Sequence, residues 1–183
     1  MAHHNKRIEN PYSGQSIVFL KTAHETQGEL LEMESTYAPH SAKPAEHYHP
    51  IQKEDFTVLQ GVITVTLNGA TRLLRAGDKL HIPPNTVHAM WNDSDEPAVV
   101  NWQVRPALNT EYLLETGMGL AKDGKTNKKG LPGLLQAIAI ARYFSKAYRL
   151  ANPPYALQQV LFAFLGPVAK MLGYRATYQE YID

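Results

Sequence analysis

The chain has 183 residues, of which 44% are hydrophobic and 19% are charged, a composition typical of one globular, barrel-sized domain with a modest appendage. Its 18 Lys and Arg against 17 Asp and Glu give a net charge of +1, so no long-range field favours nucleic acid or an anionic membrane. The absence of cysteine excludes disulfides, thiolate metal ligands and a cysteine nucleophile.

The first ten residues are polar and basic, and no apolar stretch follows them. They therefore lack the features of a secretory signal peptide. Together with the lack of cysteine, this favours a cytoplasmic protein. We expect a small molecule, rather than nucleic acid, as its ligand or substrate.

Residues 17–115 have the pattern of an antiparallel β protein. Short runs of alternating residues are separated by Gly, Pro, Asn and Asp. In one of them Leu31, Met33 and Tyr37 share a face, which is the period-two pattern of a half-buried strand. Residues 62–67 are rich in β-branched residues and run into Asn68-Gly69, a strong signal for a hairpin turn. The turn spacing predicts a barrel or sandwich.

The last third of the chain differs in composition and predicts helices. We expect a barrel domain over residues 1–116, a flexible linker over 117–130 and a helical extension over 131–183. Within the extension, apolar residues recur at helical spacing over 132–150 and 155–173, with a break at Gly166-Pro167. No run of about 20 apolar residues is uninterrupted, so no membrane span is expected. The apolar faces should pack on the barrel or on a second subunit, and we expect a homodimer.

A pair of histidines in a predicted strand indicates a metal site. His47 and His49 are two residues apart, so both can project from the same face of the strand. Glu54 and His88 are candidates for the remaining ligands, because divalent Fe, Mn, Ni and Zn accept mixed nitrogen and oxygen ligands.

These residues fall in a pattern that resembles the cupin superfamily. Its two motifs, G-x5-H-x-H-x3-4-E-x6-G and G-x5-P-x-G-x2-H-x3-N, are matched by His47-x-His49-x4-Glu54-x6-Gly61 and Gly77-x5-Pro83-x-Asn85-x2-His88-x3-Asn92. The departures are Ala42 and Asn85, each in place of a glycine, and Asn tolerates positive φ. The resemblance implies a mainly β fold, a double-stranded β-helix or jelly-roll cupin barrel with added C-terminal α-helices. It also implies one divalent metal ion on His47, His49, Glu54 and His88.

Strand parity extends the site to pocket-lining residues. Phe56 and Val58 share a face with Glu54, and Met90 and Asn92 share one with His88. Phe56 and Val58 could equally well be core residues that only fill the interior of the barrel. Parity leaves two choices for the last strand: either Asn101, Gln103 and Arg105 or Val100, Trp102 and Val104 face the interior. Ten tyrosines make it impossible to single out one of them as a pocket acid.

The resemblance does not select a reaction, because the superfamily spans dioxygenases, isomerases, decarboxylases, hydrolases and binding proteins. The leading hypothesis is a metal-dependent enzyme acting on a small oxygen-bearing organic substrate, with dioxygenase-like chemistry. The alternative is a non-catalytic cupin that binds a metal or a small metabolite. The sequence identifies no catalytic residue beyond the metal ligands.

Overall fold

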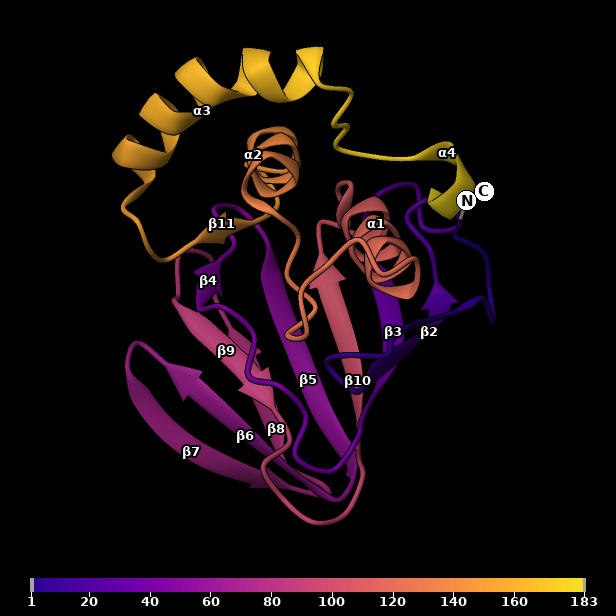
Figure 1. Ribbon diagram of the computed structural model, residues 1–183. Helices are drawn as coiled ribbons and strands as arrows, with labels where there is room; N and C mark the ends of the chain where they lie inside the picture. Colours follow the sequence, from indigo (N-terminus) through magenta and orange to yellow (C-terminus); the bar gives the residue numbers. More distant parts are fainter. Residues whose placement is uncertain (1, 183) are drawn as a thin grey trace.

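The computed structural model describes residues 2–182 and consists mainly of two antiparallel β-sheets that face each other (Figure 1). The six strands of the larger sheet follow the order β1-β2-β3-β10-β5-β8, and their bounds are β1 Arg7–Asn10, β2 Gln15–Lys21, β3 Leu31–Tyr37, β10 Ala98–Arg105, β5 Lys53–Gln60 and β8 Lys79–Ile82. The smaller sheet has the order β11-β4-β9-β6-β7, with β11 Arg149–Leu150, β4 His47–Tyr48, β9 His88–Trp91, β6 Val62–Leu67 and β7 Ala70–Arg75. The predicted jelly-roll barrel is confirmed.

Alternating burial along the strands creates the interior of the barrel. In β3, every second residue from Leu31 to Tyr37 is buried, and in β5 the buried residues are Glu54, Phe56 and Val58. A carboxylate thus lies in an otherwise apolar row. One apolar cluster fills the space between the two sheets, and another lies between the larger sheet and the first helix.

Two connections between strands depend on positive φ. Asn68 and Gly69 have φ values of 47° and 84°, and they join β6 to β7 as the sequence predicts. Gly61, with φ 76°, links β5 to β6, and a side chain there would collide with the carbonyl oxygen of Pro97. The glycine that ends the first cupin motif is therefore required by backbone packing.

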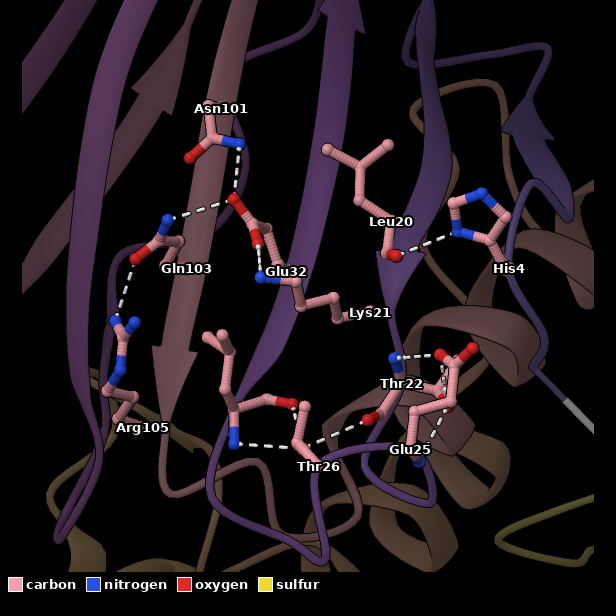
Figure 2. Close-up of polar contacts among 11 residues, drawn as sticks. His4, Leu20, Lys21, Thr22, Glu25, Thr26, Glu32, Asn101, Gln103 and Arg105 are labelled. Atoms are coloured by element: carbon pink, nitrogen blue, oxygen red, sulfur yellow. Dashed lines mark hydrogen bonds and ion pairs between the residues drawn. The ribbon is translucent and has the colours of Figure 1, made fainter.

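The structure decides the parity of β10. Val100 and Val104 are fully buried, and Trp102 packs against the barrel core. Figure 2 shows the opposite face, where Asn101 and Gln103 both donate hydrogen bonds to Glu32, at 3.0 and 2.9 Å. Arg105 and Lys21 extend this polar network. The sheet therefore has a polar outer face, and Trp102 faces inward.

The helical region begins earlier than expected. Helix α1 (Thr110–Lys122) includes the first six residues of the segment 117–130, so the prediction of a flexible linker is wrong for residues 117–122. Two glycines make this stretch look like a loop, but α1 packs on the larger sheet through Met118. Gly119 lies against the ring of Tyr181, where a Cβ would not fit.

Two predictions for the extension also need correction. The first run ends as α2 (Leu134–Tyr143) instead of continuing to residue 150, because the chain turns to pair as β11 with the open edge of β4. Helix α3 (Tyr155–Met171) passes through Gly166-Pro167 without a break. Pro167 has no backbone N–H, so the carbonyl oxygen of Ala163 lacks its helical hydrogen-bond donor. Both residues are exposed, so water can donate a hydrogen bond to this oxygen instead. A short α4 (Gln179–Ile182) follows.

In Figure 1, α2 and α3 lie over one end of the barrel, next to β4 and β11. Among residues 2–182, no helix is long and apolar enough to cross a membrane.

Candidate metal centre

Three histidines from β4, the segment after it and β9 lie close together. His47 lies in β4 directly opposite His88 in β9, and His49 follows β4 immediately. One ring nitrogen of each histidine lies within 4.8 Å of those of the other two. Among residues 2–182, these three histidines are the one group of at least three His, Asp or Glu side chains close enough together to hold a metal ion. His49 and His88 are buried, whereas His47 is half-buried.

Glu54 reaches the same point from the opposite sheet. Its Oε2 atom lies 2.9 Å from His88 Nε2 and 3.3 Å from His49 Nε2. Its Oε1 atom accepts a hydrogen bond of 2.9 Å from Trp102 Nε1. Glu54 does not belong to the close group of three histidines, but it contacts two of its members.

Hydrogen bonds to backbone carbonyls fix the orientation of all three imidazoles. The Nδ1 atoms of His47, His49 and His88 bond the carbonyl oxygens of Ala45, Ala147 and Thr86 at 3.0, 2.6 and 2.9 Å, respectively. A carbonyl only accepts, so each Nδ1 carries a hydrogen, and in a neutral ring Nε2 presents a lone pair. Metal-binding histidines are commonly held in this way.

The resulting geometry fits a cation. His49 Nε2 and Glu54 Oε2 are buried and have no hydrogen-bond partner among the described residues. Two lone pairs that face each other at about 3 Å repel unless a proton or a metal ion lies between them. Three imidazoles and one carboxylate suit divalent Fe, Mn, Ni or Zn. The four side chains would hold such an ion between the two sheets.

The pKa values of these groups reflect both burial and their mutual contacts. Burial lowers the pKa of His47 to about 3, and the nearby His88 and His49 act in the same direction. Burial also opposes the charged form of His49, but the Glu54 carboxylate raises the His49 pKa above its usual value. Burial acts to raise the pKa of Glu54, but His49 and His88 hold it well below its usual range. Glu54 is therefore an anion at neutral pH.

Comparison with known proteins agrees with this geometry. Residues 33–104 match the model of the family described as "Cupin domain". The central part of the barrel, residues 33–104, is therefore a cupin domain. A solved structure described as a predicted oxalate decarboxylase from Thermotoga maritima superposes with a TM-score of 0.50 at 19% identity, covering 56% of this chain and 92% of that one. This likeness concerns the fold alone.

Two curated proteins are similar in sequence to this chain. Quercetin 2,3-dioxygenase of Bacillus subtilis is 36% identical over 92 residues, which are 50% of this chain but 27% of that protein. The protein named "Probable oxidoreductase virH", from Hypocrea virens, is 28% identical over 153 residues, covering 75% of this chain and 67% of that one. The chain thus spans about a quarter of the length of the dioxygenase.

The residues expected to line a pocket lie in different surroundings. Phe56, Val58 and Met90 are buried in the apolar cluster between the sheets. Asn92 is fully buried, and its amide nitrogen donates to the carbonyl oxygens of Ala38 and Glu96 at 3.2 and 2.7 Å. It therefore holds neighbouring loops together. Contact of these four residues with a ligand stays a prediction.

Sequence reasoning missed two contacts from the helical extension. Ala147 supplies the carbonyl that holds His49, and the ring of Tyr148 lies 4.7 Å from that of His47. Both residues fall in a stretch that has the spacing of a helix, and no local signal distinguishes them. Trp102 belongs to one of the two sets of β10 residues that strand parity left as possible interior residues.

Proposed function

We propose that this protein is a metal-dependent cupin enzyme that oxidises a small oxygen-bearing organic substrate with dioxygen. The observation that carries the proposal is the convergence of three oriented imidazoles and one buried carboxylate on a single point. Four protein ligands leave further positions in the coordination shell of an iron, manganese or nickel ion. The similarity to a quercetin 2,3-dioxygenase supports oxidation over the other reactions that cupins catalyse.

The protein's own residues would bind and orient the reactants. The ion would supply Lewis acidity and, if redox-active, electron transfer to dioxygen. His47, His49 and His88 would bind it as neutral ligands, and Glu54 would offset part of its charge. Trp102 would position Glu54 through its indole N–H. Phe56, Val58 and Met90 are apolar, so they favour an aromatic or aliphatic substrate over a polyhydroxylated sugar.

The test separates an enzyme from a non-catalytic binding protein. The purified protein is loaded anaerobically with Fe²⁺, Mn²⁺, Ni²⁺ or Zn²⁺, mixed with a catechol, a β-diketone or a flavonol, and then exposed to dioxygen. We expect oxygen consumption, with formation of an oxidised product, for at least one redox-active metal, and its loss in the variant His47→Ala/His49→Ala.

Tight binding of these compounds without oxygen consumption under any metal would contradict the proposal. That outcome would favour the alternative of a cupin that binds a metabolite without turning it over.

A further inference from the structure

A short segment of the C-terminal extension is part of the wall of the metal centre. Strand β11 pairs with β4 through Arg149 opposite Tyr48 and Leu150 opposite His47. The N–H of Ala151 donates to the carbonyl of Glu46 at 2.8 Å, which continues this pairing. Figure 1 shows β11 at the edge of the smaller sheet, below α2. The segment lies more than 40 residues beyond the end of the family match at residue 104.

This pairing fixes Tyr148 beside the ligands. Its ring lies 4.7 Å from that of His47, with a tilt of 31°, and 6.3 Å from that of His49. The preceding residue, Ala147, is buried, and its carbonyl binds His49. Contacts on both sides therefore hold Tyr148 in place, so ordering it would cost little entropy when a ligand binds.

The hydroxyl of Tyr148 is available for a ligand. The side chain is half-buried, and within residues 2–182 its hydroxyl has no hydrogen-bond partner. A phenol in such surroundings usually finds a partner. A tyrosine hydroxyl is protonated at neutral pH and can donate a hydrogen bond.

We propose that Tyr148 is a substrate-positioning residue whose hydroxyl donates a hydrogen bond to an oxygen atom of the ligand held at the metal centre. This inference rests on the proposed function, because it requires a metal ion on the three histidines. It deepens that proposal by specifying the ligand class. A phenolate, enolate or carboxylate oxygen would accept this bond, whereas a purely apolar ligand would gain nothing from it.

The test measures binding without turnover. The protein is loaded with Co²⁺ and titrated with 4-nitrocatechol, and binding is followed by the absorption of the metal and of the chromophore. For Tyr148→Phe we expect the Kd of 4-nitrocatechol to rise about tenfold or more, because a hydrogen bond to a charged group is lost. The affinity for Co²⁺, measured by competition with a chelator, should stay unchanged, because the ring remains.

A matched control is available in Tyr143→Phe, since Tyr143 is 58% exposed at the end of α2 and should affect neither measurement. Equal 4-nitrocatechol affinity in Tyr148→Phe and wild type would overturn the inference, as would a wild-type protein that binds Co²⁺ but not 4-nitrocatechol. Oxygen consumption tests the proposed function separately. A Tyr148 effect on binding in a protein that consumes no oxygen would support this inference while refuting the oxidation.

Discussion

Replacement of Trp102 by phenylalanine should weaken metal binding without disrupting the barrel. The indole N–H is a hydrogen-bond donor to Glu54, at 2.9 Å from Oε1, and it holds the carboxylate while Oε2 faces His49 and His88. Phenylalanine removes this donor. It retains an aromatic ring that can stack on Phe56, whose ring centroid lies 5.7 Å from that of Trp102.

The size of the effect follows from the single bond that is lost. A hydrogen bond to a charged group contributes about 1.5–3 kcal/mol, and loss of a residue that orients a metal ligand typically lowers metal affinity about 10- to 100-fold. At about 1.4 kcal/mol for each factor of ten, the two ranges agree. We therefore expect the Kd for Zn²⁺ or Co²⁺ to rise by about 10- to 100-fold in Trp102→Phe.

Chelator competition at fixed pH measures this change. The chain offers a matched control, because it has two tryptophans and the other, Trp91, contacts Lys43 rather than a metal ligand. Trp91→Phe should bind metal as the wild type does. An unchanged Kd in Trp102→Phe, with a folded protein confirmed by circular dichroism, would refute the role assigned to the Trp102–Glu54 bond.

Four further predictions concern metal content, pH, backbone packing and assembly. One divalent ion should bind per chain, as measured by elemental analysis, and binding should be lost when His47 and His49 are both alanine. Affinity should fall with falling pH, and the fall should begin above the usual histidine pKa of about 6.5. Binding needs an unprotonated His49, and Glu54 raises the His49 pKa. Protons therefore compete with the metal at His49, whereas His47, with a pKa of about 3, stays neutral. Metal retained through dialysis at pH 4.5 would contradict this. Gly61→Ala should lower the free energy of unfolding in urea by about 1–3 kcal/mol, because it combines positive φ with a clash. The exposed apolar face of α3 includes Phe164, which is 74% exposed, and Phe164→Glu should convert the expected homodimer to a monomer in light scattering; an unchanged mass would argue against pairing through this face.

Much of the candidate site could be predicted because its signals are local. The spacing of His47 and His49 places both side chains on one face of any strand. The alternation in β3 and the turn at Asn68-Gly69 also depend on neighbouring residues alone. These features, with the match to two cupin motifs, were sufficient to predict the barrel and the residues that the structure brings together.

The parts that could not be predicted depend on contacts between distant segments. The inward face of β10 is decided by its register with β3 and β5, and either parity is compatible with its sequence. Residues 147–150 have the spacing of a helix, but the open edge of β4 offers them backbone hydrogen bonds that a helix would otherwise supply. His49 and Ala147 are separated by 98 residues.

Local sequence patterns thus predicted the strands and turns, because alternation and turn chemistry depend on neighbouring residues. The match to the two cupin motifs then predicted the barrel and the four candidate metal ligands. The contact of Trp102 with Glu54, and those of Ala147 and Tyr148 with the histidines, became known from the folded structure alone. A hydrogen bond to a metal ligand can come from any segment that packs near that ligand. Such packing produces no periodic pattern in the sequence of the segment, so the sequence does not reveal it.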